Sequence, residues 1–164
     1  MALETLLLEL DKFMKNNHEQ FMLLAFEEAK KAKENGDWPF GAVVVKNNKV
    51  VGKGHVLDKS EGDVTDHAEL VALRNACHNL KTNNLEGCVI YCSNEPCIMC
   101  AAGIFQAGIG NVFIGVSRND LPHLLRPRKL HIEDLAQDTN HKITIQRGLL
   151  KDKILPLFED IEKK

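Results

Sequence analysis

Apolar residues recur at helical spacing along the start of the chain. Over residues 3–14, leucine, phenylalanine and methionine return every three or four positions, which predicts an amphipathic helix. The polar pair Asn16 and Asn17 interrupts this pattern, and a second apolar stripe with a Lys/Glu outer face runs over residues 18–34. The pattern therefore predicts two separate helices, and we interpret residues 1–16 as an N-terminal amphipathic helix extension.

A different pattern follows the second helix. Residues 42–45 and 50–54 are rich in β-formers and flank Asn47 and Asn48, which predicts a β-hairpin. Helical spacing returns over 66–80. The remaining pattern predicts strands over 87–92, 112–116 and 142–146, and helices starting at Pro96, over 130–137 and over 151–162. This alternation indicates one α/β domain, 17–164, in which a sheet of about five strands carries helices on both faces.

Composition narrows the class of protein. The chain has 164 residues, 44% of them hydrophobic, as expected for one domain with a buried core. The formal net charge of −2 gives no overall attraction toward nucleic acid or anionic membranes, so any polyanion site must be local. The first ten residues lack a basic leader and no apolar run reaches membrane-spanning length. We therefore expect a soluble, cytoplasmic protein with no membrane partner.

The cysteines favour metal binding over disulfides. Their number is odd and no export signal precedes them. They are Cys77, Cys88, Cys92, Cys97 and Cys100. Cys97 and Cys100 stand three residues apart, directly after Pro96 at the predicted start of a helix, so both can face one ion. His67 opens the helix predicted over 66–80 and can complete a set of three ligands.

Three protein ligands with an open fourth position are typical of catalytic zinc, whereas structural zinc usually has four. We predict one Zn²⁺ per subunit, held by His67, Cys97 and Cys100. A water or hydroxide would take the fourth position, since zinc lowers the pKa of bound water to about 7. Glu69, two residues after the histidine, is the expected proton shuttle. The alternatives are a redox pair or structural zinc, and a helix capping box between Asp66 and Glu69.

His-x-Glu followed by Pro-Cys-x-x-Cys is the signature of zinc deaminases. From about residue 18 onward the sequence resembles the cytidine deaminase superfamily, and within it the guanine, cytosine and tRNA adenosine deaminases. The resemblance is carried by Pro39-Phe40-Gly41-Ala42-Val43-Val44-Val45, Thr65-Asp66-His67-Ala68-Glu69 and Glu95-Pro96-Cys97-Ile98-Met99-Cys100-Ala101-Ala102-Gly103. It implies a three-layer α-β-α sandwich with a mixed five-stranded sheet, a homodimer, and hydrolytic release of ammonia from an aminated ring.

The resemblance also assigns roles beside the zinc ligands. Hydroxide would attack the ring carbon that bears the amino group, while Glu69 relays a proton to a ring nitrogen and then to the departing ammonia. The backbone N–H of Ala68 would contact the ring edge, and the backbone carbonyl of Glu95 would accept from the amino group. Phe40 would form part of the pocket wall.

The chain departs from these families at positions that recognise the substrate. Val56 stands where an asparagine usually bonds the base or ribose, and its side chain offers only apolar contact. We expect His55 or Asp66 to supply the missing hydrogen bond. Segment 117–123 lacks the Asp-x-Lys-x-Gly-Ala-x-Gly-Ser-like loop of the tRNA enzymes, and the closing segment 158–164 mixes positive and negative charges.

These departures favour a small substrate. Our main hypothesis is a zinc-dependent deaminase that converts a free nucleobase or nucleoside, such as guanine, cytosine or a related heterocycle, to its oxo form. The alternative is a tRNA-specific adenosine deaminase that forms inosine and contacts RNA through a basic loop. That loop could equally be an ordinary solvated surface. It contains Arg118, His123, Arg126, Arg128, Lys129 and His131. A second alternative is a zinc-stabilised binding protein without turnover, which the intact Glu69 disfavours.

Overall fold

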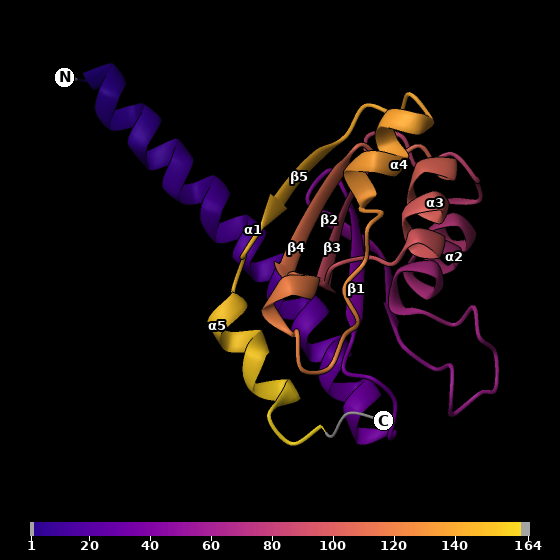
Figure 1. The fold of residues 1–164 in the computed structure, drawn as a ribbon. Helices are drawn as coiled ribbons and strands as arrows, with labels where there is room; N and C mark the ends of the chain where they lie inside the picture. The colour runs from indigo at the N-terminus through magenta and orange to yellow at the C-terminus, as the bar shows by residue number, and fades with distance from the viewer. Residues whose placement is uncertain (1, 162–164) are drawn as a thin grey trace.

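The computed structural model describes residues 2–161, with the side chains of residues 2 and 10–13 outside that description (Figure 1). The elements are α1 (Ala2–Glu34), β1 (Gly41–Lys46), β2 (Lys49–His55), α2 (Ala68–Leu80), β3 (Val89–Asn94), α3 (Ile98–Gln106), β4 (Asn111–Val116), the 3₁₀ helix η1 (Arg118–Asp120), α4 (Ile132–Asp138), β5 (Thr144–Arg147), α5 (Lys151–Ile154) and the 3₁₀ helix η2 (Leu155–Phe158). Helices lie on both faces of one sheet, so the predicted α/β sandwich is confirmed.

The sheet has five strands in the order β2-β1-β3-β4-β5. β1 is antiparallel to β2 and β3, whereas β4 runs parallel to β3 and β5, so the sheet is mixed as expected. Asn94 is paired with Val116 at the carboxyl ends of β3 and β4. The backbone N–H of Glu95 then donates to the Val116 carbonyl at 2.9 Å. Ligands of α/β proteins commonly bind beyond this kind of edge.

Two hydrophobic cores fill the space on either side of the sheet. α1 and α5 cover one face, and α2 and α3 cover the other, with α4 next to α3 (Figure 1). The core beneath α1 and α5 includes Met22, Ala25, Val43, Tyr91, Phe113, Ile154 and Phe158. The core beneath α2 and α3 includes Ala68, Ala72, Ala76, Ile90, Ile104 and Ile114. Apolar residues therefore alternate between the two faces along the central strands.

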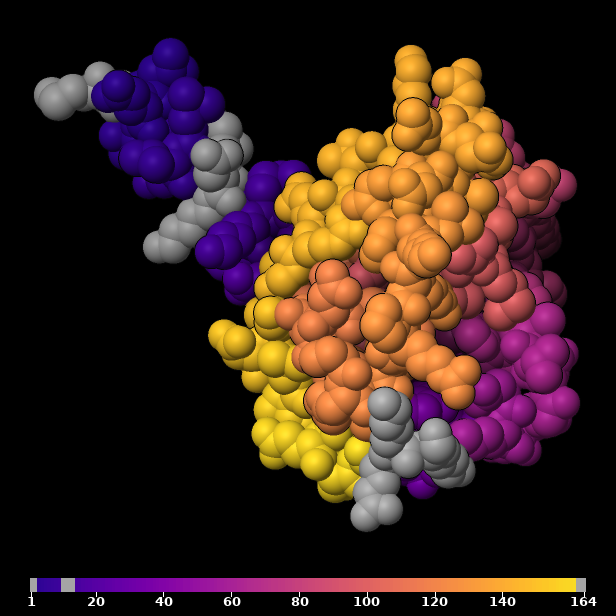
Figure 2. All heavy atoms as spheres, in the orientation of Figure 1, coloured from indigo at the N-terminus to yellow at the C-terminus, as the bar shows by residue number. Residues whose placement is uncertain are grey.

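α1 is one continuous helix of 33 residues, so the predicted break at Asn16 and Asn17 is wrong. Asparagine weakens a helix by less than about 1 kcal/mol, and tertiary anchoring next to the pair outweighs that. The ring of His18 lies 2.7 Å from the Tyr91 hydroxyl. The first half of α1 projects from the body, and the side chains of residues 3–9 are exposed (Figures 1 and 2). The separate role of residues 1–16 stays a prediction.

Two other predicted helix boundaries, both near prolines, differ in the structure. Pro96 lies before the N-cap residue Cys97, so α3 begins at Ile98 rather than at the proline. The closing helix predicted over 151–162 is α-helical for only four residues and continues as η2. Pro156 has no N–H to donate to the preceding turn, which explains the change. Within residues 2–161 no helix combines the length and apolar character needed to cross a bilayer.

Two glycines allow α2 to lie directly on β2. A Cβ on Gly52 would lie 2.3 Å from the Ala72 carbonyl oxygen, and one on Gly54 would lie 2.4 Å from the Ala68 carbonyl oxygen. Real side chains do not tolerate such contacts, so only glycine permits this approach. The start of α2, which carries His67, is thereby fixed against the sheet.

Candidate zinc centre and catalytic pocket

Two helix N-termini bring three metal-binding side chains together. His67 is the N-cap residue of α2, Cys97 is the N-cap residue of α3, and Cys100 lies in the first turn of α3. The two sulfurs are 3.4 Å apart, and His67 Nδ1 lies 3.6 Å from Cys97 Sγ and 3.5 Å from Cys100 Sγ. The predicted ligands therefore form one cluster.

The cluster fits zinc. Ligand atoms about 2.0–2.3 Å from one tetrahedral ion lie about 3.5–3.8 Å from one another, close to the 3.4–3.6 Å found here. A hydrogen bond from Cys100 lowers the pKa of Cys97 to about 3, so this ligand is a thiolate at neutral pH. The helix N-terminus also favours negative sulfur. Without a metal, Cys100 remains a thiol, because its hydrogen bond with Cys97 and its burial raise its pKa. Zinc would displace this proton, and two thiolates and one imidazole would leave one tetrahedral position for a further ligand.

Glu69 stands beside the ligands on the first turn of α2 and is 6% exposed. Burial raises the pKa of its carboxyl above the usual range, although contact with Cys100 and His67 opposes this effect. A raised pKa suits a group that must take up and release a proton near neutral pH. Burial and the raised pKa are compatible with the predicted proton shuttle, and the catalytic role of Glu69 stays a prediction.

A cavity of about 240 Å³ opens next to this cluster. Its lining residues are Trp38, Phe40, Val56, Asp58, His67, Glu69, Asn94, Glu95, Cys97, Arg118, Leu125 and Arg128. Trp38 and Phe40 stack with ring centroids 5.8 Å apart and an interplanar angle of 14°, which gives the cavity an aromatic wall. Such a wall suits a flat heterocycle.

Four of the predicted substrate contacts are at or next to this cavity. Phe40, Val56 and Glu95 line it, and Val56 is 2% exposed and packed in the core. Ala68 is the first residue of α2 and is also buried, with its side chain in the same core. The roles assigned to the backbone groups of Ala68 and Glu95 stay predictions.

The other two predicted contacts are engaged elsewhere. His55 Nδ1 lies 2.8 Å from Glu28 Oε2 on α1, and Asp66 forms an ion pair with Arg74. Neither His55 nor Asp66 is among the residues that line the cavity. Because His67 caps α2 without a side-chain hydrogen bond, the capping box between Asp66 and Glu69 does not form.

Sequence reasoning missed several pocket residues. The motifs assign no role to Trp38, Asp58, Asn94 or Leu125, and they predict Arg118 and Arg128 only as members of a basic loop. Trp38 directly precedes the Pro39–Val45 segment, and Asn94 directly precedes Glu95-Pro96, so proximity to a motif was an available signal. Asp58 and Leu125 reach the cavity from irregular segments, for which the sequence carried no such signal.

Arg118 and Arg128 bring positive charge to the cavity. The Arg118 backbone N–H donates to Glu95 Oε2 at 2.9 Å, and its Nε donates to the Arg126 carbonyl at 2.5 Å. Burial and repulsion from Arg128 lower the pKa of Arg118. Within residues 2–161, neither guanidinium forms an ion pair with a carboxylate. An anionic ligand would relieve this repulsion.

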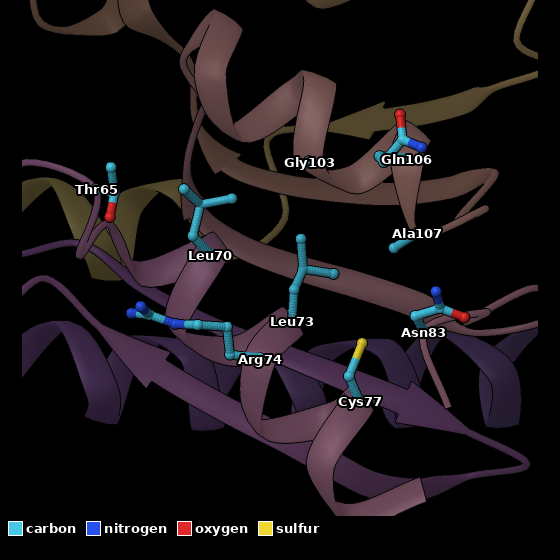
Figure 3. Close-up of a pocket in the computed structure, with 9 residues that line it drawn as sticks. All are labelled: Thr65, Leu70, Leu73, Arg74, Cys77, Asn83, Gly103, Gln106 and Ala107. Carbon is cyan, nitrogen blue, oxygen red and sulfur yellow. The ribbon is translucent and has the colours of Figure 1, made fainter. Parts of the chain in front are cut away.

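A second hollow, of about 520 Å³, lies between α2 and α3. Leu70 and Leu73 of α2 extend toward α3, where Gly103 leaves room for Leu70 (Figure 3). Thr65, Arg74, Cys77, Asn83, Gln106 and Ala107 complete the lining. None of the three zinc ligands lines this hollow, so it is a surface feature separate from the catalytic cavity.

Comparison with known proteins defines the family. Residues 15–116 match the cytidine and deoxycytidylate deaminase zinc-binding region, which includes the three ligands and Glu69. The chain belongs to this family. It is accordingly a zinc-dependent hydrolase of the kind that acts on C–N bonds of nucleobases and nucleosides.

The relatives include deaminases from both proposed substrate classes. The tRNA-specific adenosine deaminase of Buchnera aphidicola is 38% identical over 92% of this chain and 97% of its own length. The guanine deaminase of Bacillus subtilis is 37% identical over 63% of this chain and 67% of its own length. A structure from studies of A-to-I editing by tRNA:A34 deaminases shares 31% identity with a TM-score of 0.73, covering 84% of this chain and 98% of that one.

Some matches to tRNA-specific adenosine deaminases span only 62% of the relative's length. Even so, these relatives support the alternative, a tRNA adenosine deaminase, better than the main hypothesis, a deaminase of a free nucleobase or nucleoside.

Proposed function

We propose that this protein deaminates adenosine to inosine in transfer RNA. The observation that carries the proposal is the pair Arg118 and Arg128, two guanidiniums without carboxylate partners among the described residues, at the cavity beside the zinc ligands. A free base has no group that needs two positive charges, whereas a nucleotide within RNA has phosphates on both sides of the base. The near full-length similarity to a tRNA-specific adenosine deaminase supports the same substrate.

The cavity can hold one base taken out of its stack. Enzymes that modify a base extrude it into a pocket, where it stacks on aromatic side chains. Trp38 and Phe40 provide the stacking wall, and the volume of about 240 Å³ suits a single base rather than a helix. The phosphates would stay outside, within reach of Arg118 and Arg128.

Bound zinc supplies a hydroxide nucleophile at neutral pH. Glu69 takes one proton from the attacking water and delivers it to the ring nitrogen next to the amino-bearing carbon. It then moves the second proton, from the hydroxyl now on that carbon, to the departing amine, so that the carbonyl forms as ammonia leaves. Adenosine and water thus become inosine and ammonia. Glu69 is 6% exposed, which limits the access of bulk solvent to its carboxyl during these transfers.

Deamination of a free base, such as guanine, is the second candidate. It is favoured by the similarity to the Bacillus subtilis guanine deaminase and by the enclosed aromatic wall, which would stack any purine. The two functions differ in their need for phosphate. Only the RNA substrate should depend on Arg118, on Arg128 and on ionic strength.

Activity on a substrate panel tests the proposal. Zinc-loaded protein is incubated with an anticodon stem-loop RNA, adenosine, guanine, guanosine and cytosine, and ammonia and inosine are measured, with Glu69→Ala as the inactive control. We expect turnover of the RNA. Arg118→Gln and Arg128→Gln should each lower kcat/KM for the RNA about tenfold. Each should also reduce the slope of log kcat/KM against log salt concentration by about one, the value of one phosphate contact. Lys49→Gln, at the exposed first residue of β2 and outside the cavity lining, is the matched charge control.

Turnover of guanine without turnover of RNA would replace the proposal with the second candidate. Turnover of RNA that Arg118→Gln and Arg128→Gln leave unchanged would keep the activity but remove the role of the two arginines.

We further propose that the hollow between α2 and α3 receives a second copy of the chain. Leu70 is only partly covered there, and Met99 on α3 is 37% exposed, so apolar surface is available for a homodimer. Analytical ultracentrifugation over a concentration series tests this. A dimer that Leu70→Asp converts to a monomer supports the proposal, and a monomeric wild type contradicts it.

A further inference from the structure

Two side-chain atoms in the catalytic cavity lack any hydrogen-bond partner. Among the described residues, only Asp58 Oδ1 and Asn94 Nδ2 are buried polar side-chain atoms without one. Both residues line the cavity that holds Glu69. Native proteins rarely leave buried polar groups unpaired, and the exceptions require an explanation. A ligand that enters this cavity would explain both.

The orientation of the Asn94 amide follows from a chain of hydrogen bonds. The Gly41 backbone N–H donates to Ser93 Oγ at 2.9 Å. The Ser93 hydroxyl in turn donates to Asn94 Oδ1 at 3.3 Å. The oxygen side of the amide is thereby used, and the NH₂ group is left as a free donor. Asn94 is 4% exposed, so bulk water does not satisfy this donor.

Asp58 is held at the cavity by the residues that follow it. Asp37 Oδ1 accepts hydrogen bonds from the backbone N–H groups of Lys59 at 3.0 Å and Ser60 at 3.2 Å. Asp37 Oδ2 accepts a third bond, at 2.6 Å, from the Ser60 hydroxyl. On the other side, the Leu57 N–H donates to the Asp66 carbonyl at 2.9 Å. The backbone around Asp58 is therefore fixed, although it belongs to a loop.

We propose that Asn94 and Asp58 are a recognition pair that reads the substrate with one donor and one acceptor. This inference rests on the proposed function and deepens it. Within an RNA chain, an adenosine whose amino group occupies the reacting position has one donor left, the ribose 2′-hydroxyl, because its other hydroxyls are esterified. Its remaining purine acceptors are N3 and N7. Asp58 accepts the 2′-hydroxyl, and Asn94 donates to a purine ring nitrogen.

The pair makes the enzyme sensitive to the sugar as well as to the base. An acceptor that is left unpaired when the 2′-hydroxyl is missing disfavours DNA. A donor that meets a C–H group in place of a ring nitrogen disfavours a deaza base for the same reason. Each preference is thus assigned to one atom of one side chain.

Combined changes in enzyme and substrate test this assignment. The stem-loop RNA is prepared with 2′-deoxyadenosine, 3-deazaadenosine or 7-deazaadenosine at the target position, and kcat and KM are measured for wild type, Asp58→Ala and Asn94→Leu. Wild type should lose at least tenfold in kcat/KM on the 2′-deoxy substrate and on one deaza substrate. Asp58→Ala should lose the first preference only, and Asn94→Leu the second only. Asp63→Asn, an exposed change in the same loop, is the matched control.

A readout independent of activity separates recognition from folding. Because Asn94→Leu removes an unpaired buried donor, the zinc-loaded variant should unfold at the same temperature as wild type or higher. A clearly lower Tm would assign Asn94 a structural role and overturn the proposal. The proposal would also be overturned if Asp58→Ala kept the preference for the 2′-hydroxyl and Asn94→Leu kept the preference for the ring nitrogen.

Failure of the proposed function would give a different result. If wild type does not deaminate the RNA, binding of guanine, cytosine and their nucleosides to zinc-loaded Glu69→Ala is measured by calorimetry. A ligand whose affinity falls at least fivefold with Asn94→Leu or Asp58→Ala retains the recognition pair with another substrate. Unchanged affinities, or no binding of any compound, overturn it.

Discussion

The Glu95 carboxylate accepts a hydrogen bond from the backbone N–H of Arg118 at 2.9 Å. Glu95 precedes the Pro96-Cys97 motif, and Arg118 begins η1 after the neighbouring strand β4. The other Glu95 oxygen lies 3.5 Å from an Arg147 nitrogen and 3.7 Å from His131 Nδ1. This one side chain therefore connects the zinc-binding segment to the loop that presents positive charge to the cavity.

Loss of this connection should weaken substrate binding more than chemistry. In Glu95→Ala the backbone carbonyl remains, but Arg118 is no longer positioned, so we expect KM for RNA to rise about tenfold with kcat reduced much less. Zinc content should stay at one per chain. Glu133→Gln removes the exposed partner of Arg147, at 2.6 Å, without touching the Arg118 bond, and is the matched control. A fall in kcat with unchanged KM would contradict this account.

Zinc removal should destabilise the protein as well as inactivate it. A metal present at about a thousand times its dissociation constant stabilises the folded state by about 4 kcal/mol, or about 8–16 °C in Tm for a domain of this size. Chelation of wild type and the variant Cys97→Ser should both show this loss in calorimetry. Cys77→Ser, a partly buried cysteine outside the cluster, should keep one zinc by elemental analysis. Retention of zinc by Cys97→Ser would rule out its place in the ligand set.

The sequence allowed the zinc cluster to be predicted because two of its ligands lie in one turn and the third belongs to a recognisable motif. Cys97 and Cys100 share one turn, and their motif together with His67 defines the site without knowledge of the rest of the chain. Asp58 and Leu125 could not be predicted, because loops reach the cavity only through tertiary contacts such as those of Asp37.

For the fold as well, the features that depend on neighbouring residues could be predicted, and some of those that depend on tertiary contacts could not. Periodicity predicted the order of the strands and helices along the chain. It failed at the asparagine pair in α1, where packing around His18 outweighs a weak local preference, and at Pro156, where one missing N–H ended a regular apolar pattern.

The close approach of α2 to β2 predicts that Gly54→Ala will disturb the zinc site from a distance. The added Cβ would lie 2.4 Å from the Ala68 carbonyl, one residue from His67. Overpacking of this kind typically costs about 1–3 kcal/mol. We expect lower stability in urea denaturation together with weaker zinc binding in competition with a chelator. Lys53→Ala, on the exposed side of β2, should change neither quantity. Normal zinc affinity in Gly54→Ala would show that α2 can shift away from β2 without moving the zinc ligand His67.

Glu28 should make folding stability sensitive to acid. Burial alone would raise the pKa of its carboxyl, but hydrogen bonds from Lys31 and His55 lower it below the usual 4.5. A lowered folded-state pKa contributes stability that is fully present above the unfolded pKa and is lost as the pH falls through the folded value. The stability difference between wild type and Glu28→Gln should be about 1–3 kcal/mol at pH 6 and shrink below pH 4.5. Urea denaturation between pH 6 and pH 3 measures it, and a constant difference would refute the linkage.

The projecting start of α1 should contribute little to the stability of the domain. All side chains of residues 3–9 are exposed, and Leu3 and Leu8 are 68% and 70% exposed. Farther along, His18 lies 2.7 Å from the Tyr91 hydroxyl and stacks on Phe113 at 4.2 Å, so the helix is anchored from there onward. Deletion of residues 2–9 should therefore lower Tm by less than about 3 °C, since the side chains of residues 3–9 are all exposed and bury little apolar area.

A point change at the anchor is the contrasting experiment. His18→Ala keeps the chain length but removes the contacts with Tyr91 and Phe113, and it should lower Tm by more than the deletion. Calorimetry of both variants, with zinc content measured in parallel, compares the two halves of α1 directly. If the deletion were the more damaging change, the exposed leucines would have to be covered in solution, and ultracentrifugation of the full chain would then show association that the deletion abolishes.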